Sequence, residues 1–274
     1  MFPRAVMPAI KIVPRRSGER AHRDLGWLRT SQTFETLQDV EGGHYGFGNL
    51  RILNEDRVQA HTGFGMHSHS EFEIFSYVIS GELAHHDSMG NIEVLKRGDI
   101  QMTSAGTGIR HSEKAHGEEQ VHFLQIWAFP EHENLQPQYY TRHFTDDEKR
   151  DRWVRIVAPV GTEGVIDKRE AIGPTPIHSS VSVYVTVLSR GASISYTVSP
   201  SHGNPRKIYV HFIESPGYDP DKAAFGQIGI AGSEGAETEL REGDGAYIVA
   251  EGGAYITVSN TGPEHAEVVL FEVE

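Results

Sequence analysis

Short alternating segments separated by turns are the feature of this sequence that most restricts its fold. From about residue 45 onward, apolar and β-branched side chains alternate with polar ones, as in residues 121–129 and 180–188. Glycine-bearing turns such as Ser80-Gly81-Glu82 separate these runs, and turn signals recur roughly every 8–12 residues. No long segment shows a 3.6-residue period, and the best helix candidate is the short stretch around residues 145–148. The sequence therefore predicts an all-β sandwich or barrel with few short helices.

The second half of the chain repeats the pattern of the first. The run Leu95-Lys96-Arg97-Gly98-Asp99 resembles Leu240-Arg241-Glu242-Gly243-Asp244, and an apolar strand follows each of them. This similarity predicts two copies of one β-barrel, which agrees with the length of 274 residues. We predict an N-terminal arm over residues 1–22, a first barrel over 23–145 and a second barrel over 146–274. The arm is expected to be irregular, because three prolines interrupt it.

Composition excludes several classes of function. The chain has no cysteine, so disulfides, iron–sulfur clusters and thiol nucleophiles are absent, and any metal must be held by His, Asp or Glu. A formal net charge of −13 argues against direct binding to nucleic acid. No apolar run is long enough to suggest a membrane span, and no phosphate loop, nucleophile elbow or dinucleotide fingerprint is present.

Two pairs of metal-binding side chains stand out among the 16 histidines. His67 and His69 are two residues apart, and so are His111 and Glu113. Residues i and i+2 of a strand point to the same face, so two neighbouring barrel strands would bring three imidazoles and a carboxylate to one point. Such a set suits a divalent transition ion and leaves one or two coordination positions open.

The other candidates carry weaker signals. Glu73 is expected in the wall of the site rather than on the metal. The remaining histidines of the first half lack a paired spacing and are predicted to be surface or satisfied barrel residues; they include His85, His86, His116, His122 and His132. Histidines of the second half are too dispersed to form an obvious site, so the second barrel is predicted to be metal-free.

Specific motifs over about residues 20–145 make the chain similar to the pirin family of bicupins. The motifs include Asp24-Leu25-Gly26-Trp27-Leu28, Asn54-Glu55-Asp56-Arg57-Val58, Gly65-Met66-His67-Ser68-His69, Gly98-Asp99-Ile100-Gln101, Gly108-Ile109-Arg110-His111-Ser112-Glu113 and Leu124-Gln125-Ile126-Trp127. The resemblance implies two cupin-type β-barrels packed face to face, with one metal ion in the N-terminal barrel. The family's ligands fall on His67, His69, His111 and Glu113. Fe(II) is the favoured ion, with Cu, Ni, Mn and Zn as alternatives.

Pirins have been linked to two roles, and both are kept as expectations. The first is oxidative cleavage of flavonols such as quercetin by O₂, in which Glu113 would be the general base that accepts the 3-hydroxyl proton. The second is a non-enzymatic, metal-dependent and redox-sensing co-regulator that binds a transcription regulator in the nucleus. Of the two roles, the enzyme is favoured, as a dioxygenase of the quercetin 2,3-dioxygenase type. The expected location is the cytoplasm, with the nucleus as an alternative.

Overall fold

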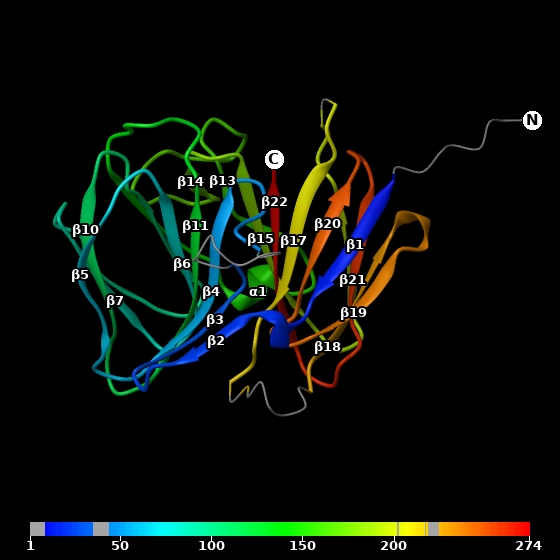
Figure 1. Ribbon diagram of the computed structural model, residues 1–274, viewed down its shortest axis with the longest axis horizontal. Coiled ribbons are helices and arrows are strands. Elements are labelled where there is room, and N and C mark those ends of the chain that lie inside the picture. Colours follow the sequence, from blue (N-terminus) through cyan, green and yellow to red (C-terminus); the bar gives the residue numbers. More distant parts are fainter. Residues whose placement is uncertain (1–8, 35–43, 202, 217, 219–224) are drawn as a thin grey trace, which may run out of the picture. The chain divides into compact units, whose positions relative to one another are not determined.

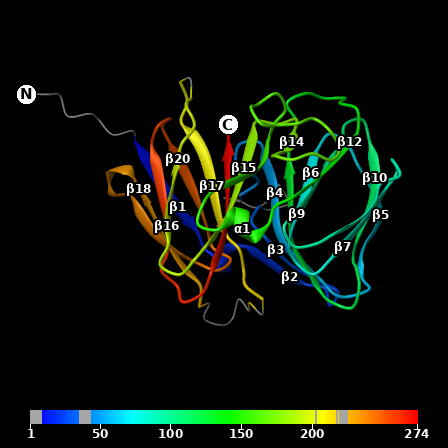
Figure 2. The ribbon, with the colours of Figure 1, turned by 180° about the vertical axis from the view of Figure 1, so that it is seen from behind.

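The computed structural model describes residues 9–34, 44–201, 203–216, 218 and 225–274, and it divides into two compact units. Unit 1 comprises residues 1–19, 146–154 and 183–274, and unit 2 comprises residues 20–145 and 155–182. Both units are built almost entirely from strands, as Figures 1 and 2 show. The predicted all-β bicupin fold is thereby confirmed.

Unit 2 is a barrel of two antiparallel sheets, drawn in blue-cyan to green (Figure 1). Its strands are β2 (Ala21–Asp24), β3 (Leu28–Gln32), β4 (Leu50–Val58), β5 (Gly63–His69), β6 (Glu73–Ser80), β7 (Leu83–Asp87), β8 (Ile92–Leu95), β9 (Asp99–Ser104), β10 (Ile109–Ala115), β11 (Val121–Ala128), β12 (Gln138–His143), β13 (Val154–Pro159) and β14 (Thr175–Ile177). The larger sheet has the order β12-β9-β6-β11-β4-β3-β2, and the smaller one the order β5-β10-β7-β8. Strands β13 and β14 form a short parallel pair.

Apolar side chains close one end of the unit 2 barrel. Val78 on β6, Leu83 on β7 and Phe123 on β11 are completely buried and belong to one cluster. Polar groups line the interior beyond this cluster, including Gln101 on β9 and Glu113 on β10. Because burying a polar group without a partner costs free energy, these groups are paired, and Gln101 donates a hydrogen bond to Glu113.

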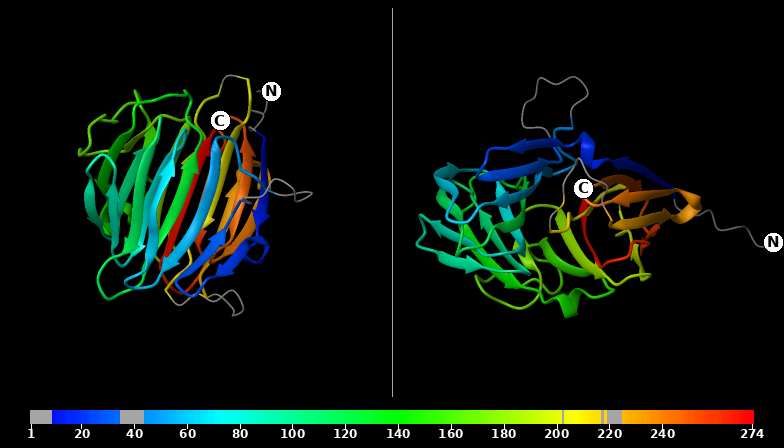
Figure 3. Two further views of the ribbon diagram at one scale, coloured as in Figure 1. Left: turned by 60° about the vertical axis from the view of Figure 1, so that its left-hand side comes forward. Right: turned by 90° about the horizontal axis from the view of Figure 1, so that it is seen from below.

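Unit 1 contains the second barrel, whose later strands run from orange to red (Figure 3). Its elements are β1 (Ile10–Arg15), the 3₁₀ turn η1 (Ser17–Glu19), α1 (Asp146–Lys149), β15 (Val181–Leu188), β16 (Ser193–Thr197), β17 (Arg206–Phe212), β18 (Gln227–Gly232), the 3₁₀ turn η2 (Ser233–Gly235), β19 (Glu237–Arg241), β20 (Gly245–Ala250), β21 (Tyr255–Asn260) and β22 (Ala266–Val273). The strands of the larger sheet follow the order β1-β20-β17-β22-β15, and those of the smaller sheet β16-β21-β18-β19.

The two barrels repeat one another strand by strand. The order β9-β6-β11-β4 of unit 2 returns as β20-β17-β22-β15 in unit 1, and β5-β10-β7-β8 returns as β16-β21-β18-β19. The two similar turn sequences occupy the same place, between β8 and β9 and between β19 and β20. Where unit 2 pairs His67 with His111, unit 1 pairs Tyr196 with Ile256, inside an apolar cluster.

Part of the N-terminal segment is more regular than predicted. Residues 10–15 form strand β1, which pairs with β20 and lies at the edge of its sheet. Pro14 is tolerated there because one side of an edge strand has no neighbouring strand, so the N–H that proline lacks is not needed for a backbone hydrogen bond. The expected short helix is present as α1, and no helix of the described residues is long and apolar enough to cross a membrane.

Candidate metal centre

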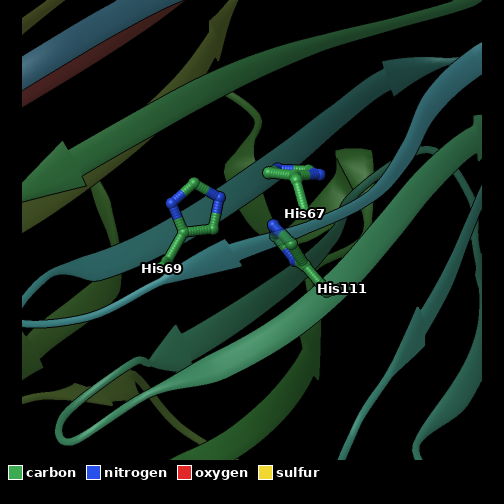
Figure 4. A group of neighbouring side chains, drawn as sticks. All are labelled: His67, His69 and His111. Carbon is green, nitrogen blue, oxygen red and sulfur yellow. The ribbon is translucent and has the colours of Figure 1, made fainter.

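Three histidines from two paired strands meet inside the unit 2 barrel, as Figure 4 shows. His67 and His69 come from β5 and His111 from β10, and their ring centroids lie 4.6–4.9 Å apart. One ligand nitrogen from each ring lies within 4.8 Å of the other two. The register of β5 against β10 shifts between the pairs His67–His111 and Phe64–Glu113, which marks a β-bulge beside the site. Bulges of this kind often re-aim side chains at functional sites.

Glu113 is held in a fixed orientation by three neutral donors. Its Oε1 accepts hydrogen bonds from Ser76 Oγ at 3.1 Å and from Gln101 Nε2. Its Oε2 accepts from Gln125 Nε2 at 2.7 Å. Tyr139 OH donates to Gln101 Oε1 at 3.0 Å, so the Gln101 amide can only turn its NH₂ group toward the carboxylate. Both Glu113 and His111 are 1% exposed, on the inward face of β10.

The three imidazoles fit a divalent transition ion. His67 Nδ1 donates to the Gly65 carbonyl at 2.7 Å, which leaves Nε2 available as a ligand. His69 Nε2 and both ring nitrogens of His111 are buried and have no hydrogen-bond partner among the described residues. Burial, together with the neighbouring imidazoles, lowers the pKa of His69 to about 4, and burial likewise lowers the pKa of His111. Neutral imidazole is the form that binds metal.

The structure also places three further residues that the sequence analysis considered. His85 on β7, predicted to be a surface or satisfied barrel residue, lies in the barrel with 1% exposure, and its ring is 5.4 Å from that of His111. A second group of ligand atoms, all within 4.8 Å of one another, contains His85, His111 and Glu113. Glu73 lies outside both groups and accepts hydrogen bonds from Ser104 Oγ and from the His178 backbone. His122 is a satisfied barrel residue, paired with Glu55 at 2.8 Å.

A run of aromatic rings leads from the imidazoles to the surface. Trp127 contacts His69 with ring centroids 4.8 Å apart, and Phe72 contacts both Trp127 and Phe129. Phe129 is 44% exposed. His69 also lines an open depression of about 460 Å³ with Ser70 and Arg110 among its other walls. The histidine group is therefore accessible at His69, which borders both the aromatic rings and the open depression.

Close packing of β5 on β10 predicts a sensitive glycine next to the site. A Cβ at Gly63 would lie 2.3 Å from the backbone oxygen of Glu113 and 2.5 Å from Lys114 Cα. Backbone atoms cannot yield, so Gly63→Ala should destabilise the fold by about 1–3 kcal/mol and lower the metal affinity. Urea unfolding and metal titration would measure both effects. Gly65→Ala is the matched control, because nothing lies within 4 Å of its added Cβ; equal losses in the two variants would contradict the close-packing account.

The fold of two cupin barrels, with a histidine cluster in one of them, is that of a bicupin. The sequence profile of the pirin family matches residues 15–128. A pirin-like protein of Caulobacter vibrioides is 30% identical over 249 residues, which cover 91% of this chain and 94% of that protein. The chain belongs to the pirin family.

Other relatives carry more specific names. Quercetin 2,3-dioxygenase of Escherichia coli K12 is 43% identical over 131 residues, which are 47% of this chain. The chain thus spans little more than half of that relative, 57% of its length. The crystal structure of YhhW from Escherichia coli superposes with a TM-score of 0.77 at 28% identity, covering 96% of this chain and 98% of that one. A second structure of YhhW, in complex with nickel(II), superposes with a TM-score of 0.76 at 28% identity, over 96% and 99% of the two chains.

Proposed function

We propose that the protein is a metal-dependent dioxygenase that cleaves flavonols such as quercetin with O₂. The observation that carries this proposal is the group of three imidazoles whose ligand nitrogens lie within 4.8 Å of one another, two of the side chains being only partly buried. The residues that would hold one divalent transition ion are His67, His69, His111 and Glu113. Fe(II) is favoured, because imidazole and carboxylate ligands with open positions suit iron oxygenases, and Cu, Ni, Mn and Zn are the alternatives. When bound, the ion would supply Lewis acidity and redox chemistry.

Glu113 is proposed to accept the proton of the flavonol 3-hydroxyl group. Its carboxylate lies next to His111 in the barrel and is oriented by Ser76, Gln101 and Gln125. An oriented carboxylate at hydrogen-bond distance of the hydroxyl group is what general-base catalysis requires. The three orienting donors are neutral, so they hold the carboxylate in place without cancelling its charge.

We propose that the aromatic side chains of Phe72, Trp127 and Phe129 hold the flat rings of the substrate. The Trp127 ring contacts His69, and the Phe72 ring contacts Trp127, so both aromatic rings lie close to the histidine group. Aromatic rings prefer offset or edge-to-face contact with one another. The indole Nε1 of Trp127 is buried without a partner among the described residues, so it can donate to an oxygen of the bound flavonol.

Oxygen consumption with quercetin tests this function. Metal-stripped protein reloaded with Fe(II) should consume O₂ with quercetin, and the stripped protein should not. Luteolin, which lacks the 3-hydroxyl group, is the matched control and should give no consumption. Absence of turnover with several flavonols at full metal loading would contradict the proposal and favour the alternative, a metal-dependent co-regulator that binds a transcription regulator.

We propose that the protein is located in the cytoplasm. The relatives compared above are bacterial proteins, so they give no support to the alternative nuclear location.

A further inference from the structure

A second set of ligand atoms shares His111 with the three histidines described above and is completely buried in the barrel. It consists of His85 on β7 with His111 and Glu113 on β10. The ligand atoms of these three side chains all lie within 4.8 Å of one another, as in the first set. All three side chains are 1% exposed, whereas His67 and His69 are partly open to solvent. We propose that His85, His111 and Glu113 form a second, buried binding position for a divalent transition ion. This inference shares ligands with the proposed metal site but does not depend on the proposed reaction.

The hydrogen bonding of His85 prepares one of its nitrogens for a metal. His85 Nε2 lies 3.2 Å from Asp87 Oδ2, and a carboxylate can only accept, so Nε2 carries the proton. Nδ1 is then the nitrogen with a free lone pair, and it is buried with no partner among the described residues. A histidine that donates one ring N–H to a carboxylate is the usual arrangement of a metal-binding histidine.

The carboxylate behind His85 is itself fixed. Asp87 Oδ1 accepts hydrogen bonds from the backbone N–H groups of Met89 and Asn91, and Oδ2 accepts from Asn91 Nδ2 at 2.8 Å. The His85 ring stacks on Tyr139 with centroids 4.8 Å apart and an interplanar angle of 22°. These contacts hold the imidazole in one orientation, so little ordering is needed when an ion arrives.

His111 lies between the two positions. Its ring centroid is 4.6 Å from that of His67 and 5.4 Å from that of His85, and in the described part of the chain neither of its nitrogens has a hydrogen-bond partner. Because the positions share His111 and Glu113, two divalent ions would repel each other at short range and compete for ligands. We therefore expect one ion per chain at saturation, with the buried position available when the outer one is lost.

Binding of Co(II) to metal-stripped full-length protein tests this inference. The variant His67→Ala/His69→Ala should still bind one Co(II) per chain, more weakly than the wild type, with visible absorption of an imidazole–carboxylate complex. Adding His85→Ala should lower the remaining Co(II) affinity by at least about 100-fold. Loss of a residue that only hydrogen-bonds to a ligand costs about 10–100-fold, so a larger loss indicates that His85 is itself a ligand. Adding His86→Ala instead should change nothing, because the His86 side chain is exposed on the other face of β7.

Two results would overturn the inference. One is a folded double variant that binds no more Co(II) than the triple variant with His85→Ala. The other is equal Co(II) affinity in the triple variants that carry His85→Ala and His86→Ala. Near-UV circular dichroism checks folding, and His67→Phe/His69→Phe, which keeps ring volume without a ligand atom, replaces the alanine pair if that pair unfolds. Neither oxygen nor flavonol enters this measurement, so failure of the proposed enzymatic function leaves its outcome unaffected.

Discussion

Glu113→Gln is expected to lower flavonol oxidation by about 10²–10⁴-fold, the contribution of a positioned base, while much of the metal is retained. Three neutral imidazoles remain to hold the ion, but the amide neither balances its charge nor takes a proton. Because Glu113 accepts from Ser76, Gln101 and Gln125 through both oxygens, the new NH₂ group must also face a donor. A stability loss of about 1–3 kcal/mol should accompany the loss of activity. Turnover per bound metal ion, measured with quercetin, separates the two effects.

Glu73→Gln is the matched control for this variant. Glu73 is as buried as Glu113 and also uses both carboxylate oxygens, toward Ser104 and the His178 backbone, but it belongs to neither ligand group. We expect a comparable loss of stability and unchanged turnover per metal ion. Unchanged oxygen consumption in Glu113→Gln would remove Glu113 from the mechanism.

Asp56→Asn is expected to abolish a large pH dependence of stability in the metal-free protein. Asp56 on β4 is 3% exposed, and burial raises its pKa from 3.8 to about 7. The negative charges of Glu113 and Glu55 add to this rise, while Thr30 and Arg20 oppose it. The folded state therefore keeps a proton that the unfolded chain releases above pH 3.8, so this group destabilises the fold progressively between pH 3.8 and 7.

The size of this effect follows from the shift in pKa. At about 1.36 kcal/mol per pKa unit, the free energy of unfolding of the wild type should fall by about 4 kcal/mol between low pH and pH 8 because of this group. Asn resembles the protonated acid at every pH, so the variant and the wild type should be equally stable near pH 3.5 and differ most at pH 8. Urea unfolding across this range measures the difference. A constant difference between the two proteins at all pH values would show that Asp56 does not carry the raised pKa.

Much of the fold was predictable because it depends on local pattern. Alternating segments such as β11 and β15 could be read directly, and the repeated Gly-Asp turn indicated two barrels, which the matching strand orders confirm. Strand β1 was missed because Pro3, Pro8 and Pro14 suggested an irregular N-terminal segment. Its pairing with β20, more than two hundred residues away in sequence, is a long-range contact with no local signal.

The site was predictable in part. The i, i+2 spacing indicated the three histidines that lie together in the structure. His85 and Asp87 follow the same spacing on β7, but Asp87 is not a second histidine, and the pair gave no comparable signal. Gln101 and Gln125 lie within motifs of the family resemblance, yet nothing in those motifs says that both amides point at Glu113. Such contacts depend on the register of β9, β10 and β11, which a single sequence does not reveal. The ligand set itself and the predicted domain limits stay predictions.

The different interiors of the two barrels have a consequence for the protein in a cell short of metal. Unit 1 fills the place of the histidines with Tyr196, Ile256 and other apolar side chains, so packing of these side chains stabilises its interior without a metal ion. In unit 2, β5 and β10 enclose imidazole nitrogens that have no hydrogen-bond partner among the described residues. An ion that binds only the folded barrel adds its binding energy to that strand pair and not to unit 1. Metal starvation would thus loosen one barrel selectively and offer proteases an entry into β5 and β10 while the other barrel keeps its shape.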